Sequence, residues 1–240
     1  TDLPIEGTTS GEAVDSAQEQ YRMQEIWLAP ETTASLQQMA RQSHLTISTL
    51  AQGAWGILLA RYNQVDDVVF GATVSGRPPD LAGAESMVGI FINTLPLRVR
   101  IAPDTTVVEL LSAIQAQAAD ARQYEYAPLV QVQGWSDVPR DRALFDSIMV
   151  FENYPVDKAL AEQKSSLAIE NVRSMEQTNY PITVVSGVGG NGLLLKVAYD
   201  GRRFSDAAIS RLLGHLRTII EAYPTHLERP VAALPLLTAA

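Results

Sequence analysis

The sequence predicts an α/β protein: a layered sandwich in which helices pack on a mixed β-sheet. Segments with the 3.6-residue apolar periodicity of amphipathic helices alternate irregularly with short apolar runs typical of strands. Two such runs flank the Gly-Gly-Asn-Gly sequence at 189–192, which indicates a tight hairpin turn and hence an antiparallel pair in the sheet. Without internal repeats, the 240 residues suit one large domain or two small ones.

The expected elements follow from local patterns taken in chain order. They are a polar arm over 1–20, a strand over 21–28, a helix after Pro30, a second helix capped by Thr46 or Ser48, strands over 68–74 and 87–101, a helix from Val107 towards Tyr124, strands over 144–151, 166–172, 181–188 and 192–200, and a last helix capped by Ser205 or Asp206.

The helices are predicted from one-sided apolar spacing and from capping residues. Thr106 and Glu109 form a T-x-x-E capping box at the start of the third helix. Gly53 and Gly56 indicate that the second helix packs closely against another backbone. The residues expected to face inward are Leu36, Met39 and Ala40, then Leu50, Ala54, Ile57 and Leu58, then Leu110, Leu111, Ile114 and Ala118, and finally Ile209, Leu212, Leu213, Leu216, Ile219 and Ile220.

Two segments stand out among the remaining elements. The run 87–101 is almost continuously apolar, which predicts a strand covered on both faces. Residues 229–240 contain Pro230 and Pro235, and we expect this tail to be extended and linker-like.

The composition excludes several classes of function. The 18 basic and 27 acidic residues give a net charge of −9, and because no stripe of Lys and Arg is present, we exclude nucleic acid and anionic membranes as partners. The absence of cysteine excludes disulfides and thiolate chemistry. The polar, acidic start is no signal peptide, and no apolar run reaches the roughly 20 residues of a membrane helix. We therefore expect a cytoplasmic location.

Common catalytic and cofactor motifs are also missing. The chain has no G-x-G-x-x-G, no G-x-x-x-x-G-K-[ST], no G-x-S-x-G and no H-E-x-x-H. The three histidines, His44, His215 and His226, are scattered, and each is interpreted as structural. We therefore expect no metal site and no catalytic residue within this chain.

A family resemblance first emerges at residues 87–98. Their sequence M-V-G-I-F-I-N-T-L-P-L-R resembles the fifth core motif, roughly V-G-x-F-[VI]-N-T-x-x-x-R, of the condensation domains of nonribosomal peptide synthetases. Other segments are similar to the family in the same order: D-D-V-V-F-G at 66–71, V-S-G-R-P at 74–78, Y-E-Y-A-P-L at 124–129, L-F-D-S at 144–147 through F-E-N-Y-P at 151–155, T-N-Y-P at 178–181, Y-D at 199–200 with Phe204, and L-P-L-L-T at 234–238. The resemblance covers about residues 21–238, and its motifs are specific as a set.

The resemblance is incomplete, because the family's active-site sequence H-H-x-x-x-D-G is missing and no two histidines are adjacent. The family fold is a pair of chloramphenicol-acetyltransferase-like lobes with a tunnel between them. The resemblance therefore implies the C-terminal lobe alone. Residues 1–20 are then a polar arm or inter-lobe linker, 21–228 the lobe, and 229–240 a linker towards a following adenylation domain.

The function implied by the resemblance is amide-bond formation in the whole enzyme. A condensation domain joins a carrier-bound donor acyl or peptidyl thioester to a carrier-bound acceptor aminoacyl thioester. This lobe is expected to supply tunnel wall and floor and to be inactive alone. The implied partners are the N-terminal lobe, donor and acceptor peptidyl carrier domains and the adenylation domain. No cofactor is expected to bind directly, and the phosphopantetheine arms belong to the carriers.

The resemblance also implies a substrate and pantetheine channel lined by Ser75, Gly76, Arg77, Asn93 and Thr94. Asn93 is a carboxamide in an apolar run, so it either hydrogen-bonds the substrate or braces its strand. Arg77 either pairs with an acidic carrier or a pantetheine phosphate, or it makes an internal salt bridge. For Asn93 and for Arg77, the functional and the structural interpretation both remain open at this point.

Two other functions are considered beside the half-enzyme. One is a non-catalytic module for carrier docking or scaffolding, which would share this sequence. The other is epimerisation or heterocyclisation on the same fold. The sequence Ile-Phe-Ile-Asn-Thr at 90–94 argues against heterocyclisation, because relatives of that type carry an Asp-Phe-Thr sequence there.

Overall fold

The computed structural model describes residues 21–77, 81–152 and 178–237, and its elements follow the predicted order. They are β1 (Tyr21–Leu28), α1 (Pro30–Gln42), α2 (Ile47–Asn63), β2 (Asp67–Val74), a 3₁₀ turn η1 (Ala84–Ser86), β3 (Asn93–Arg100), α3 (Val107–Ala121), a 3₁₀ turn η2 (Arg122–Tyr124), α4 (Leu129–Gly134), β4 (Ser147–Glu152), β5 (Ile182–Gly189), β6 (Gly192–Asp200), α6 (Asp206–His226) and a 3₁₀ turn η3 (Val231–Ala233). The strand expected over 166–172 lies outside the described residues.

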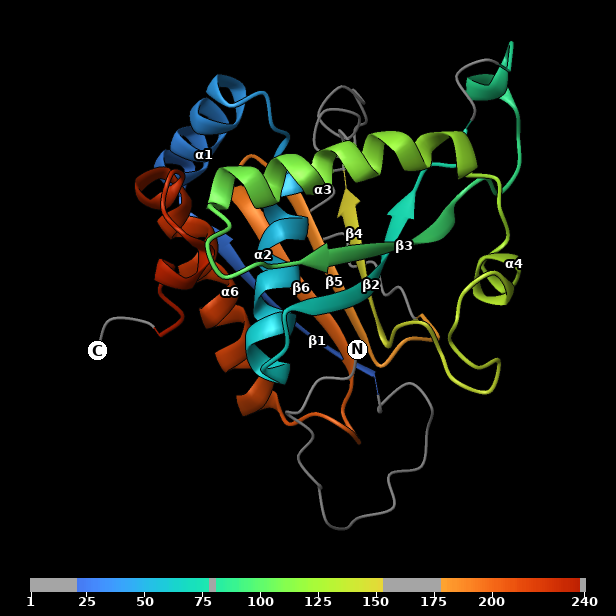
Figure 1. Ribbon diagram of the computed structural model, residues 1–240. Coiled ribbons are helices and arrows are strands. Elements are labelled where there is room, and N and C mark those ends of the chain that lie inside the picture. Colours follow the sequence, from blue (N-terminus) through green and yellow to red (C-terminus); the bar gives the residue numbers. More distant parts are fainter. Residues whose placement is uncertain (1–20, 78–80, 153–177, 238–240) are drawn as a thin grey trace, which may run out of the picture.

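Six strands of the described chain form one mixed sheet in the order β1-β6-β5-β4-β2-β3 (Figure 1). β4 is parallel to both β5 and β2, whereas the β1–β6, β5–β6 and β2–β3 pairs are antiparallel. β5 and β6 form the hairpin predicted at 189–192. The mixed sheet of the predicted fold class is confirmed.

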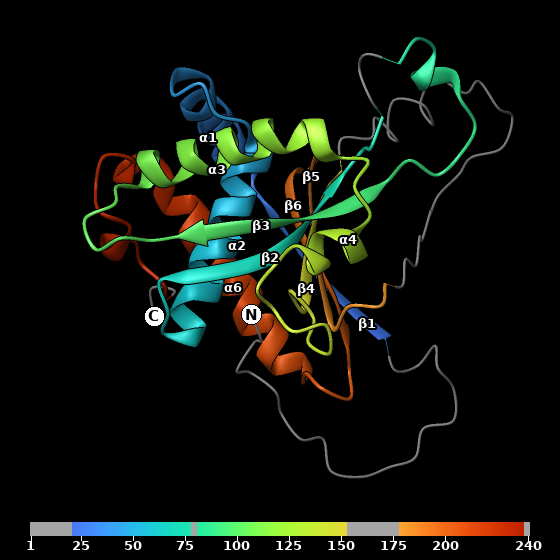
Figure 2. The same cartoon turned by 45° about the vertical axis from the view of Figure 1, so that its right-hand side comes forward.

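The long helices α1, α2, α3 and α6 lie on one face of this sheet, as both views of the ribbon show (Figures 1 and 2). α2 is central, because it contacts α1, α3 and α6 as well as the sheet. Its Trp55 is fully buried, and the indole Nε1 donates to Ser147 Oγ on β4 at 3.3 Å. The apolar core therefore lies between the helices and the sheet.

The predicted caps are present at three helices. Thr46 Oγ1 accepts from the Thr49 amide at the start of α2, and Ser205 Oγ accepts from the Ala208 amide at the start of α6. At α3 both halves of the capping box form, and the bonds from Thr106 hold the pKa of the Glu109 carboxyl below its ordinary value. These bonds satisfy amides that a helix start leaves without intrahelical partners.

The glycines of α2 are needed for a different reason from the one predicted. A Cβ at Gly53 would overlap with the Leu111 side chain of α3, and a Cβ at Gly56 would lie 2.8 Å from the Val99 side chain of β3. The close approach is to side chains of the neighbouring elements, not to another backbone.

The strand predicted over 87–101 is too long, and its expected coverage on both faces is wrong. Only Asn93–Arg100 forms β3, which is an edge strand whose buried residues alternate with less buried ones. Pro96 inside the run was a signal for this position, because a proline removes a ladder donor and is tolerated at sheet edges. The six residues before Asn93 form no strand within the described structure.

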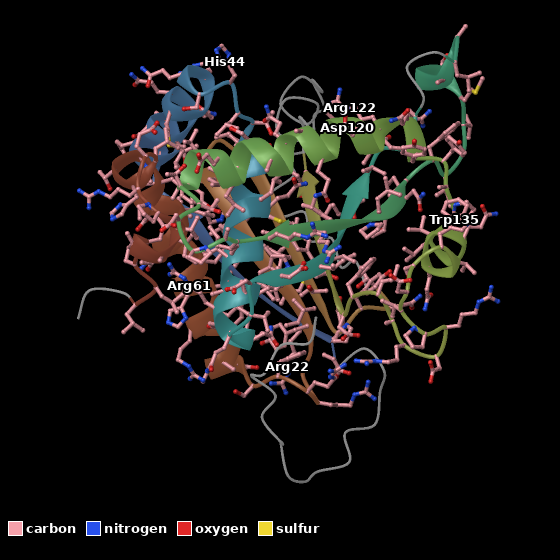
Figure 3. All side chains as sticks on the ribbon, viewed as in Figure 1. Arg22, His44, Arg61, Asp120, Arg122 and Trp135 are labelled. Atoms are coloured by element: carbon pink, nitrogen blue, oxygen red, sulfur yellow. The ribbon has the colours of Figure 1, made fainter. Side chains whose placement is uncertain are left out.

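The end of the chain, predicted to be extended, packs against the body up to Leu234. Val231 and Leu234 are buried, and η3 forms between them. Arg61 of α2, labelled in Figure 3, donates from Nη2 to the Val231 carbonyl at 2.8 Å. Pro230 forms an isolated bridge with Thr106. This packing fixes where the tail leaves the fold.

Candidate functional site

The structure brings together all five residues predicted to line a channel. Ser75, Gly76 and Arg77 directly follow β2, and Asn93 and Thr94 begin β3. The antiparallel register pairs Val74 with Asn93, so both groups lie at the same end of the β2–β3 hairpin. In Figures 1 and 2 this is the end from which the chain projects towards η1, away from the helical layer.

Asn93 braces β3 against the turn that follows α3. Its Nδ2 donates to the carbonyl oxygens of Glu125 and Ala127, at 2.8 Å each. Its Oδ1 accepts from the amide of Thr94 at 2.9 Å. Both amide hydrogens are therefore bonded within the protein, which explains how a polar side chain is accommodated in this apolar run.

Gly76 is bound to the same turn through a residue that the sequence did not single out as functional. The Gly76 amide donates to Oε2 of Glu125 at 3.0 Å. Gly76 has a φ of 63°, and a Cβ there would overlap with the carbonyl oxygen of Phe91. Glu125 lies 49 residues after Gly76, so no local pattern could have paired them.

Arg77 bonds within its own segment, but not through the salt bridge considered from the sequence. Its Nη1 donates to the carbonyls of Ala84 and Met87, the latter at 3.2 Å. Its guanidinium carbon lies 4.4 Å from the ring centre of Phe91, a cation–π distance. The partners found among the described residues are two carbonyls and an aromatic ring.

The segment before Asn93 exposes an unusual amount of apolar surface. Val88, Ile90 and Ile92, which we call the apolar row, have relative exposures of 105%, 97% and 62%. Tyr126, Val130 and Trp135, around α4, are also mostly exposed. In Figure 3 Trp135 lies on the α4 side of the molecule and His44 lies on the opposite side, beside α1. Exposed apolar groups of this kind mark surfaces that bind a partner.

Ionisable groups elsewhere in the described chain pair with neighbouring side chains. Arg98 binds Asp67 through two hydrogen bonds of 2.8 and 2.6 Å, and this pairing lowers the pKa of the Asp67 carboxyl. His215 Nδ1 lies 2.8 Å from the Tyr62 hydroxyl, and burial lowers the pKa of its imidazole.

The described residues contain no group of three or more His, Cys, Asp or Glu side chains arranged to hold a metal ion. Within the same residues, no helix has the length and apolar character needed to cross a membrane. What the candidate site does contain is internally bonded polar groups beneath an exposed apolar row. This arrangement is suited to forming a surface and positioning what binds to it.

Comparison with protein families and curated proteins gives concordant matches. A family model described as "Condensation domain" matches residues 2–240. The chain is 47% identical over 221 residues to a linear gramicidin synthase of Brevibacillus parabrevis, covering 92% of this chain and 4% of that protein. It is 36% identical over 234 residues to bacitracin synthase 3 of Bacillus licheniformis, covering 95% of this chain and 4% of that protein. The chain thus spans only a small part of the length of these curated relatives.

Solved structures share the fold at low sequence identity. The condensation domain of the monacolin K polyketide synthase MokA is 18% identical with a TM-score of 0.74, covering 95% of this chain and 53% of that chain. A four-domain nonribosomal peptide synthetase bound to AMP and glycine is 16% identical with a TM-score of 0.79, covering 92% and 18%. The X-domain from teicoplanin biosynthesis is 18% identical with a TM-score of 0.73, covering 99% and 54%. These neighbours confirm the predicted chloramphenicol-acetyltransferase-like fold.

Proposed function

The chain belongs to the condensation-domain family of nonribosomal peptide synthetases, and on that premise we propose that it is the C-terminal lobe of such a domain. In the whole domain it contributes tunnel wall and floor to the reaction that joins two carrier-bound thioesters by an amide bond. The observation that carries the proposal is the apolar row. Its three side chains are exposed, although most large apolar side chains of the described residues are buried.

The exposed row supports a missing partner because of its energetic cost. Burial of a Val or Ile side chain stabilises a protein by about 1.5–3 kcal/mol. Three such side chains beside each other therefore represent binding free energy that this chain does not use by itself. The N-terminal lobe is the partner proposed for them. The length comparison agrees, since the chain spans about half of the solved MokA condensation domain.

The proposed chemistry divides between the two lobes. The acceptor amine attacks the donor thioester carbonyl, the C–N bond forms, the C–S bond breaks, and the donor pantetheine thiol leaves after the amine loses a proton. The protein's contribution is to hold both tethered substrates end to end, which replaces a bimolecular encounter. Because this chain has no adjacent histidines, the histidine sequence of the family is assigned to the other lobe. The chain alone is then inactive.

The five residues at the end of the β2–β3 hairpin form the floor end of the proposed channel. Asn93 shapes it through its two bonds to the turn after α3, and Gly76 keeps the backbone there free of a side chain. Ser75, Arg77 and Thr94 complete this end of the channel. The pantetheine arms that pass through it are carried by the partner carrier domains, so the chain itself needs no bound cofactor.

The other partners belong to the same proposal. They are donor and acceptor peptidyl carrier domains and an adenylation domain that follows the tail at 229–240. The packing of Val231 and Leu234 supports a fixed exit direction for that tail. The expectation of a cytoplasmic location stays part of the proposal.

Product formation measured by intact mass tests the proposal. Carrier-bound donor and acceptor are mixed with the chain alone, with an N-terminal lobe alone, and with both. Amide product is expected only with both. It should disappear when the second histidine of the H-H-x-x-x-D-G sequence in the N-terminal lobe is changed to alanine. Product formed by this chain alone would overturn the proposal.

A second candidate, a non-catalytic docking module, is favoured by one comparison. A structure that covers 100% of this chain with a TM-score of 0.73 and 17% identity is described as a complex of the X-domain and OxyB from teicoplanin biosynthesis. The fold can therefore serve as a binding partner for another protein. A stable complex of the two lobes that makes no product, but binds a carrier domain, would favour this function.

A further inference from the structure

The direction in which the apolar row points depends on how successive side chains alternate along this segment. Side chains of an extended segment point to opposite sides in turn, so Ile90 and Ile92 share one side while Phe91 takes the other. The exposures follow this pattern: Ile90 and Ile92 are mostly exposed, and Phe91 is partly buried. These residues precede β3 and form no strand, so turning Phe91 outward would turn its neighbours Ile90 and Ile92 away from solvent. Whatever holds Phe91 therefore decides what the segment displays.

Arg77 is the group that holds Phe91. Its guanidinium lies over the Phe91 ring, 4.4 Å from the centre, while Nη1 donates to the carbonyls of Ala84 and Met87. One side chain thus contacts the segment at three points spread over eight residues. Two of those points are backbone carbonyls. The other backbone hydrogen bonds of this segment, in its described part, lie within the turn around η1.

The base of the segment is fixed separately. Glu125 accepts from the Gly76 amide through its carboxylate, and its carbonyl accepts from Asn93 Nδ2. A single residue of the α3–α4 turn therefore holds both ends of the segment, the end of β2 and the start of β3. The contact between Arg77 and Phe91 adds a further point of attachment between these two ends.

We propose that Arg77 is a positioning residue that holds the conformation of the segment carrying the apolar row, so that Val88, Ile90 and Ile92 are displayed to the N-terminal lobe before the lobes meet. This inference rests on the proposed function and makes it more specific. Arg77 then acts within the channel floor by holding this segment and is not the ligand of a carrier phosphate. A preformed row avoids the entropic cost of ordering the segment during association.

Amide hydrogen exchange on the isolated chain tests the positioning directly. The amides of Ala84 and Ser86 donate to carbonyls within the turn that Arg77 holds, at 3.0 Å each. In Arg77→Ala these two amides should exchange about tenfold faster, because two hydrogen bonds and the ring contact are lost. In Arg77→Lys the exchange rates should lie between those of the wild type and those of Arg77→Ala, since lysine keeps a cation over the ring. Unchanged exchange in Arg77→Ala would overturn the proposal.

Two comparisons separate this effect from general loosening. Amides of β2 and β3 should exchange equally in wild type and Arg77→Ala. The matched control is Arg100→Ala, which removes an exposed arginine from β3. Arg100 Nε lies 3.6 Å from Oδ2 of Asp67. This substitution should leave the exchange of Ala84 and Ser86 unchanged.

Association with a separately expressed N-terminal lobe, measured by calorimetry, tests the consequence. Arg77→Ala should weaken binding about tenfold at an unchanged unfolding midpoint, and Ile90→Asp should abolish it. Equal affinity of wild type and Arg77→Ala would overturn the positioning role even if exchange changes. If the wild-type chain fails to bind the lobe, the proposed function fails, while the exchange experiment still decides whether Arg77 holds the conformation of the segment.

Discussion

Two buried serines on neighbouring strands have opposite environments. Ser147 of β4 accepts a hydrogen bond from Trp55 Nε1, whereas Ser186 of β5 is the one buried side-chain polar group without a hydrogen-bond partner in the described part of the chain. Ser186 is fully buried. A buried hydroxyl without a partner loses its bonds to water on folding and regains nothing.

Replacing each serine by alanine should therefore change stability in opposite directions. Ser186→Ala is expected to raise the free energy of unfolding by about 1 kcal/mol, because the unpaired hydroxyl disappears. Ser147→Ala should lower it by a similar amount, about 1 kcal/mol, because the indole N–H of Trp55 stays buried without an acceptor. Urea denaturation of the three proteins measures both. Equal destabilisation by the two variants would show that Ser186 has a partner in solution.

His215 makes stability depend on pH through the α2–α6 contact. Burial, followed by the charge of Arg211, lowers the pKa of its imidazole from the ordinary value of 6.5. A lowered pKa means that the unfolded chain takes up the proton first. Its contribution is therefore fully present above pH 6.5 and is lost as the pH falls through the folded-state pKa.

The unfolding midpoint of the wild type should accordingly drop more between pH 7.5 and pH 5.5 than that of His215→Gln. The glutamine keeps a polar group facing the Tyr62 hydroxyl but does not titrate, so the difference between the two pH profiles isolates the histidine. Parallel profiles would contradict the assignment. Thermal unfolding at about five pH values is sufficient.

At the scale of elements, the outer edge of β3 is closed without a neighbouring strand. Thr94, Pro96 and Arg98 share the outward direction of the backbone, by the two-residue period of a strand. The Thr94 amide donates to Asn93 Oδ1, Pro96 has no N–H, and the Gln117 side chain of α3 bonds both the amide and the carbonyl of Arg98 at 2.9 Å. Open strand edges recruit other chains, and this one is blocked.

Gln117→Ala should open that edge. Without the carboxamide, the Arg98 amide and carbonyl become available to a second β3, so light scattering at rising protein concentration should detect association that the wild type lacks through this edge. The control is Gln115→Ala on the same helix, whose carboxamide instead bonds the His44 carbonyl and the Thr46 amide. If both variants scatter alike, Gln117 does not protect the edge.

The elements also show which features a sequence can reveal. The four long helices were predictable because their apolar faces and caps are local, as in the Thr106–Glu109 box. β3 was predicted too long because apolar residues at 87–92 were assigned to the core, whereas Val88, Ile90 and Ile92 are exposed. α4 was missed because six residues contain too few turns for a periodic pattern.

The candidate site was predictable in its members but not in its contacts. Gly76, Arg77 and Asn93 stand out by type and motif, yet their partners lie elsewhere. The bonds of Asn93 reach carbonyls 32 and 34 residues away, and a carbonyl leaves no trace in a sequence. Glu125 was not identified because its role depends on the fold that places it beside Gly76.

At the scale of the whole molecule, the sheet joins the two ends of the described chain. β1 pairs with β6 over its full length, Tyr21 opposite Asp200 and Leu28 opposite Leu193. Side chains reinforce the pairing, since Gln24 donates to the Tyr199 hydroxyl and Arg22 binds Asp206 at 2.8 Å. By contrast, β3 contacts both β2, which precedes it in the sheet, and α3, the next helix along the chain.

This connectivity sets an order of events as the chain is synthesised. The segment from α2 to α3 can assemble as soon as it emerges, because its contacts join elements that follow one another in the sequence. Among the described strands, β1 is made first, but its partner β6 is translated last. During that interval the apolar side chains of β1, Trp27 among them, are exposed to other nascent chains. Of the strands in this sheet, the one synthesised first is thus among the last to be paired, and the interval before it pairs is when this fold is most vulnerable to misassembly.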